Sequence, residues 1–163
     1  MRLPAGAALA LLALAGQAAP LAAQEQLPKF YVYGEDDGTR ELTECKASHA
    51  SAIGAVQAEL RGAGVTIQAN ADDPEAVMDV YINVSPMPVA GQKTCAYSLT
   101  LAFESFGSTA NPFTGTTEFT KLAYCSKGAL MVGERGTAQA EINTTLRRHT
   151  RECLTKYQGR NSR

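Results

Sequence analysis

Four cysteines constrain the fold of this chain more than any other feature of its sequence. They are Cys45, Cys95, Cys125 and Cys153. An even number of cysteines in an exported chain predicts two disulfides. No Cys-x-x-Cys motif is present, so the spacing points neither to a thioredoxin-like redox site nor to a zinc ribbon.

The first 23 residues have the pattern of a bacterial secretory signal peptide. Arg2 precedes an apolar stretch of about a dozen residues, and Ala22 and Ala23 are the small residues that a signal peptidase needs. The apolar stretch is shorter than the ~20 residues that span a bilayer, and no lipid-accepting cysteine follows it closely. We expect cleavage after Ala23, no lipid anchor and no membrane span. The periplasmic or secreted protein then begins at Gln24 and has 140 residues, a length typical of one domain.

Hydrophobic periodicity predicts two helices and about five strands. Apolar residues recur at spacings of three and four over residues 41–61 and 137–157, and glycines follow both segments. Strands are predicted at residues 29–34, 65–70, 77–85, 94–105 and 116–125. The expected fold class is α+β: a mostly antiparallel sheet of about five strands, two helices packed on one face, two disulfides and a frayed C-terminal tail.

The spacing of the cysteines predicts how they pair. A hairpin between residues 94–105 and 116–125, centred on Ala110, sets Cys95 opposite Cys125. The same register turns Lys121 toward the apolar face, which is a local conflict. If the two helices lie antiparallel on the sheet, Cys45 near the start of the first meets Cys153 near the end of the second. We therefore expect disulfides Cys45–Cys153 and Cys95–Cys125.

Two mirrored Cys/His pairs leave a metal site open as an alternative. Cys45 precedes His49 by four residues, and His149 precedes Cys153 by four. On helices, each pair would project from one face. Two thiolates and two imidazoles could then form a tetrahedral zinc site. An oxidising compartment favours the disulfide instead.

Catalytic signatures are missing from the sequence. We find no Gly-x-Ser-x-Gly elbow, no phosphate-cradling glycine loop and no His-Glu-x-x-His motif. No catalytic residue and no cofactor is predicted. An unrecognised secreted hydrolase remains an alternative, because catalytic triads are assembled in space rather than in sequence.

Two features suggest a binding surface. Residues 105–115 read as a polar loop that carries Phe106 and Phe113, and large apolar side chains on such a loop either fold back or dock on a partner. Arg147, Arg148 and Arg151 give the last predicted helix a basic face. We expect a small exported, non-catalytic binding or accessory protein of the cell envelope that contacts a protein partner rather than nucleic acid.

Overall fold

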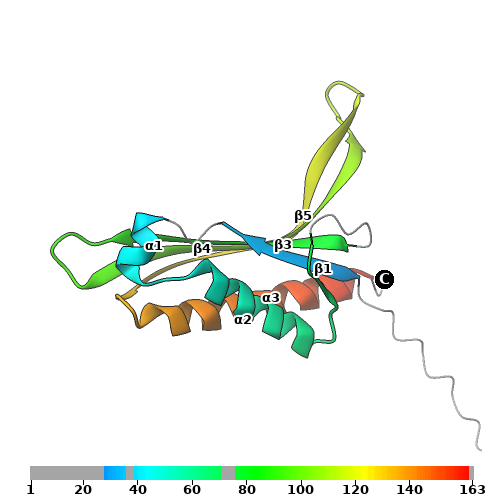
Figure 1. Cartoon of the computed structure of the whole chain (residues 1–163). Helices are drawn as coiled ribbons and strands as arrows, with labels where there is room; N and C mark the ends of the chain where they lie inside the picture. Colours follow the sequence, from blue (N-terminus) through cyan, green and yellow to red (C-terminus); the bar gives the residue numbers. More distant parts are fainter. Residues whose placement is uncertain (1–27, 36–38, 71–75, 162–163) are drawn as a thin grey trace, which may run out of the picture.

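The computed structural model describes residues 28–35, 39–70 and 76–161, and the predicted cleavage site lies outside these ranges. It contains one five-stranded sheet in the order β2-β1-β3-β4-β5, with helices on one side (Figure 1). The elements in chain order are β1 Lys29–Gly34, α1 Arg40–Cys45, α2 His49–Gly62, β2 Ile67–Gln68, β3 Ala76–Pro88, β4 Thr94–Ala110, β5 Thr117–Glu134 and α3 Ala138–Asn161. The α+β class is confirmed.

The sheet is mixed, which corrects the expected antiparallel pattern. β1 pairs in parallel with both β2 and β3, whereas β3, β4 and β5 form antiparallel pairs. Parallel neighbours need a crossover connection, and the segment holding α1 and α2 supplies it between β1 and β2. The predicted strand at residues 65–70 is reduced to the two residues of β2.

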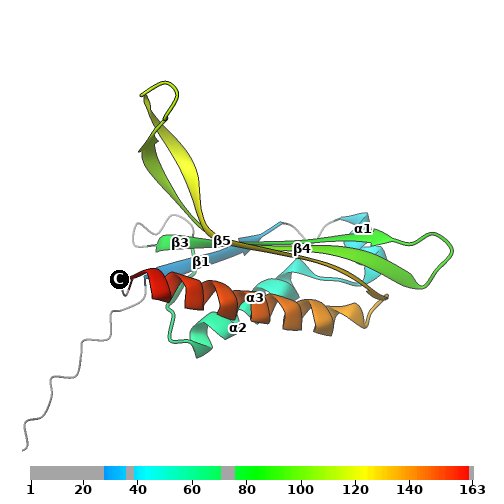
Figure 2. The same cartoon turned by 180° about the vertical axis from the view of Figure 1, so that it is seen from behind.

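Helices α2 and α3 cover one face of the sheet, as the views from both sides show (Figures 1 and 2). Alternate residues of the strands point toward these helices and are fully buried. The core includes Phe30, Val80, Ile82, Leu99, Leu101 and Phe103 from the sheet, and Val56, Leu60, Ile142 and Leu146 from the helices. Helix α3 continues to Asn161, so Gly159 does not end it as expected.

The predicted first helix is two helices, α1 and α2, separated by a short break. Lys46 adopts a left-handed conformation with φ 53°, and its N–H bonds back to the carbonyl of Thr43. Ser48 then caps α2 by accepting a hydrogen bond from the N–H of Ser51. Cys45 and His49 therefore lie on different helices, and their spacing of four does not place them on one helix face.

The register of the β4–β5 hairpin also differs from the prediction. β4 runs on to Ala110, and the chain turns over residues 111–116, where Gly115 has a positive φ of 71°. Cys95 consequently lies opposite Gly133, and Cys125 lies opposite Phe103. The prediction failed because residues 105–110 and 126–134 were taken as irregular and are strand.

The disulfides are Cys45–Cys95 and Cys125–Cys153, so both predicted pairings are wrong. In the observed register Cys95 and Cys125 lie at different positions along the hairpin and do not face each other. The helix break places Cys45 at the end of α1, beside β4. The first disulfide ties α1 to β4, and the second ties β5 to α3. Two disulfides are characteristic of exported or envelope proteins. Within the described ranges, no helix has the length and apolar character that a membrane crossing requires.

Candidate functional site

The face of the sheet opposite the helices, here called the open face, gathers polar and aromatic side chains from three strands. Tyr33 of β1 pairs with Tyr81 of β3, and Asp79 of β3 pairs with Glu104 of β4. The neighbouring side chains Val32, Val80 and Phe103 on these strands are buried in the core. Because side chains alternate along a strand, these residues share the other face.

Three tyrosines form a continuous aromatic row on the open face. The rings of Tyr31 and Tyr33 are stacked with centroids 5.8 Å apart. The ring of Tyr81 lies 5.4 Å from that of Tyr33 at a tilted angle. The hydroxyl of Tyr81 donates a hydrogen bond of 2.8 Å to Oε1 of Glu35. Each tyrosine thus presents an apolar ring and a polar tip, a combination common in binding surfaces.

Glu104 stands at the end of this row and is only 1% exposed. The hydroxyl of Tyr33 donates to its Oε1 at 2.6 Å. The ammonium of Lys121 on β5 lies 3.0 Å from its Oε2 and 5.9 Å from the centroid of the Tyr81 ring. Both carboxylate oxygens therefore have a partner, which a buried charge requires.

This arrangement shifts the pKa of two neighbouring groups. Burial, reinforced by the hydrogen bond and the charge of Glu104, raises the pKa of the Tyr33 hydroxyl well above its usual range. Burial and the charge of Glu104 also raise the pKa of Asp79. A nucleophile or general base would need a shift of the Tyr33 pKa in the opposite direction, so Tyr33 is suited to donating a hydrogen bond.

Beyond Glu104 the hairpin leaves the sheet as an arm, defined here as residues 105–122. A register shift between Phe103 and Glu104 marks its base, where an extra residue in one strand bends a hairpin. The arm projects from the side opposite the helices (Figures 1 and 2). None of its residues is buried. It is therefore an extension from the body rather than part of the core.

The arm carries the two predicted phenylalanines and one that the prediction misplaced. The rings of Phe106 and Phe119 stack with centroids 6.0 Å apart, yet the two residues remain 50% and 74% exposed. Phe113 lies in the turn at the tip and is 95% exposed. The expected loop is largely strand, and its phenylalanines do not fold back onto the sheet.

A second apolar patch lies on the open face away from the arm. Met87, Leu130 and Val132 are exposed there on β3 and β5. Ala96 of β4 lies between Met87 and Val132 in the register. These side chains line a shallow pocket of about 610 Å³.

The alternative metal set of Cys45, His49, His149 and Cys153 is not assembled. Cys45 and Cys153 belong to different disulfides. Nε2 of His49 accepts a hydrogen bond from the N–H of Val84 at 3.0 Å. Burial lowers the pKa of His149, with help from Arg148 and Lys127. In the ranges that the structure covers, no group of three or more Cys, His, Asp or Glu side chains is placed to hold a metal ion.

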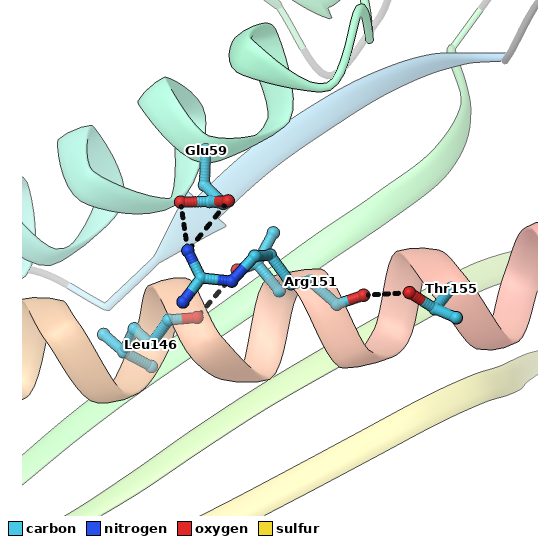
Figure 3. Close-up of polar contacts among 5 residues, drawn as sticks. Glu59, Leu146, Arg151 and Thr155 are labelled. Atoms are coloured by element: carbon cyan, nitrogen blue, oxygen red, sulfur yellow. Dashed lines mark hydrogen bonds and ion pairs between the residues drawn. The ribbon is translucent and has the colours of Figure 1, made fainter.

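The three predicted arginines of α3 are exposed, but one is engaged. Arg151 places Nη1 3.2 Å from each carboxylate oxygen of Glu59 on α2, which links the two helices (Figure 3). Arg147 and Arg148 remain on the helix surface. The basic face is thus smaller than the sequence indicates.

Sequence reasoning did not identify Glu104 and Tyr33 as residues of the open face, or Phe119 as an exposed residue of the arm. The conflict at Lys121 was the available signal, because a lysine turned toward an apolar face indicates a wrong register. In the observed register Lys121 lies on the open face beside Glu104.

Comparisons with known proteins do not assign this chain to a family. No family model matches the chain, and no curated protein does. Among solved structures, a minor lipoprotein from Acinetobacter baumannii is similar at 14% identity, over 80% of this chain and 92% of that one, with a TM-score of 0.39. These values do not establish a shared fold, so the site is interpreted from its own geometry.

Proposed function

We propose that this chain is an exported, non-catalytic binding protein of the cell envelope, and that its arm docks on a protein partner. The observation that carries the proposal is where the exposed apolar side chains lie. Every exposed large hydrophobic residue in the described ranges belongs to β3, β4, β5 or the tip of the arm: Met87, Phe106, Phe113, Phe119, Leu122, Leu130 and Val132. Gathered exposed apolar groups mark interaction sites on soluble proteins.

The arm has the chemistry of a protein contact. Three of the seven exposed hydrophobics are phenylalanines, and all three lie on it. Aromatic residues carry much of the binding energy at interfaces. Glu118 and Lys121 are its only charged residues, and Lys121 is engaged at the base. The low charge favours a protein over an anionic lipid or nucleic acid.

The exported location rests on the chain's covalent structure and leader. Both disulfides suit an oxidising compartment. The leader pattern of residues 1–23 provides a route there. The periplasm and the medium both fit these features.

The test uses a photoreactive amino acid at position 113 of the protein expressed with its own leader. We expect a covalent adduct with one protein partner in intact cells. The same amino acid at position 144 on α3 is the control and should give no such adduct. The Phe106→Ser/Phe119→Ser double variant should lose the adduct while its melting temperature changes little, because both rings are exposed.

Two outcomes would contradict the proposal. An adduct that persists in the double variant would show that the stacked phenylalanines do not bind the partner. A large fall in the melting temperature of that variant would show that the rings stabilise the fold. The second result, or the absence of any adduct at position 113, would direct attention to Arg147 and Arg148 on α3.

A further inference from the structure

We propose that β5 is the interface of a homodimer, in which the outer edges of two β5 strands pair antiparallel across a two-fold axis at Leu130. The two sheets then join into one continuous sheet. This interface is separate from the arm and does not depend on the function proposed above.

The first observation is the unpaired edge. β5 is the last strand in the order β2-β1-β3-β4-β5, so no described strand pairs with its outer side. It extends over 18 residues from Thr117 to Glu134. A long edge strand presents a row of free backbone donors and acceptors, which is a template for another strand.

The second observation is that this edge lacks the usual protection. Natural edges are blunted by charge, proline or bulges. The bulge of β5 and three of its four charged residues precede Gly128, and the fourth, Glu134, ends the strand. Lys121 is held by Glu104, and Lys127 by Glu152 at 2.6 Å. Residues 128–133 contain neither a charged residue nor proline. An edge stretch without charge, proline or a bulge indicates that a partner strand covers it.

The third observation is the exposure of the apolar residues on that stretch. Leu130 is 86% exposed and Val132 is 68% exposed. Both lie on the open face, since Leu130 pairs with Ser98 and Val132 with Ala96. A neighbouring strand would cover part of each side chain, so the pairing also reduces exposed apolar area.

A second copy fits this edge because β5 is complementary to itself about Leu130. The axis sets the two Leu130 side chains together, places Val132 opposite Gly128, and brings Glu134 opposite Ser126 and Lys127 opposite Gly133. Each large or charged side chain of this stretch then faces a small neutral residue, except Leu130, which faces the Leu130 of the other copy. Such a self-matched patch is what a two-fold interface requires.

Neighbouring axes match less well. An axis at Lys127 would set two lysines opposite each other, and an axis at Met131 would set Lys127 opposite Arg135. Like charges directly opposite are destabilising. An axis at Ala129 would set Leu130 opposite Gly128, Met131 opposite Lys127 and Val132 opposite Ser126, so that no large apolar side chain would meet another. The Leu130 axis is the one that satisfies both charge and apolar pairing.

Sedimentation equilibrium of the exported protein tests the interface. We expect the wild type to be a dimer at micromolar concentrations, and Leu130→Lys to raise the dimer dissociation constant at least about tenfold, since two lysines would meet on the axis. Phe113→Lys is the matched control, because it also replaces an exposed hydrophobic residue but lies at the tip of the arm. It should leave the dimer unchanged.

Single cysteine variants test the axis itself. Leu130→Cys should form a disulfide-linked dimer with its own copy, whereas Val132→Cys, which faces Gly128 across the interface, should not. A monomeric wild type, a dimer that survives Leu130→Lys, or one that Phe113→Lys dissociates would overturn the interface. Linkage through Val132→Cys without linkage through Leu130→Cys would overturn the axis.

Discussion

At the scale of single residues, Glu104 is the charge on the open face that most depends on its neighbours. It is 1% exposed, and its carboxylate is held by the Tyr33 hydroxyl and the Lys121 ammonium. Removing one partner of a buried charge leaves the other uncompensated, and this costs far more than losing a solvent-exposed pair. The contrast can be measured on one strand, because β5 carries a lysine of each kind.

Lys121→Met should destabilise the protein by about 1–2 kcal/mol, a value reduced because the lysine itself is half exposed. Lys127→Met is the control: its ion pair with Glu152 is exposed on both sides, so a smaller change is expected. Urea unfolding at neutral pH measures both. Adding Glu104→Gln to Lys121→Met should recover part of the loss. Equal losses in the two single variants would show that burial of Glu104 does not matter.

At the scale of elements, the break between α1 and α2 positions a disulfide. Lys46 turns the chain with a φ of 53°, and Cys45 immediately before it bonds to Cys95. The hydroxyl of Tyr97 donates to the carbonyl of Cys45 at 3.2 Å, which further fixes α1 on β4. The left-handed conformation is strained for a residue with a Cβ, and glycine adopts it freely.

Lys46→Gly should therefore stabilise the protein by up to about 1 kcal/mol, because the strain relieved exceeds the added freedom of the unfolded chain. Lys46→Ala removes the same side chain but keeps the Cβ, so it should bring no such gain. Thermal melts of the two variants separate these effects. A gain in both would assign the stabilisation to loss of the lysine side chain rather than to the backbone.

The elements also show what the sequence can and cannot predict. Alternation in β3 and β4 correctly identified the core residues Met78, Val80 and Ile82, because burial on one face imposes a period of two. Helix periodicity missed the break at Lys46, since Leu42 and Cys45 keep helical spacing with the residues of α2. The local signal in the sequence was Ser48, because serine is favoured at the N-cap of a helix and Ser48 caps α2.

The site was less predictable than the fold because it depends on register. Extending the hairpin to Ala110 moved Phe119 and Lys121 from the core face to the open face. Strand length in a polar segment such as residues 105–110 is set by pairing with the partner strand, which composition does not reveal. The disulfide pairing depends on the same register and failed with it.

At the scale of the whole molecule, the protein is a two-layer body with a projecting arm (Figure 1). The disulfide Cys45–Cys95 ties α1 to β4, and the disulfide Cys125–Cys153 ties α3 to β5. On the chain-entropy model, closing loops of 50 and 28 residues stabilises the body by about 4 kcal/mol each. Neither disulfide includes a residue of the arm, so the body is cross-linked independently of it.

The body should consequently fold without the arm. In a variant that replaces residues 105–122 with an Asn-Gly turn, Glu104 and Ala123 close a short hairpin, since they are already paired. Glu104→Gln is included because the deletion removes Lys121. The unfolding free energy should stay within about 1 kcal/mol of that of full-length Glu104→Gln, because no residue of the arm is buried. Denaturant unfolding and peptide mapping of both disulfides provide the measurements.

The same deletion separates the two proposed surfaces. The variant should lose the partner that contacts position 113, yet remain a dimer through β5, because Leu130 and Val132 lie outside the deleted segment. Failure of the deleted chain to form Cys125–Cys153 would show that the arm is needed to align β5 with α3. Loss of the dimer from a correctly folded variant would show that the arm, rather than the edge of β5, joins the two copies.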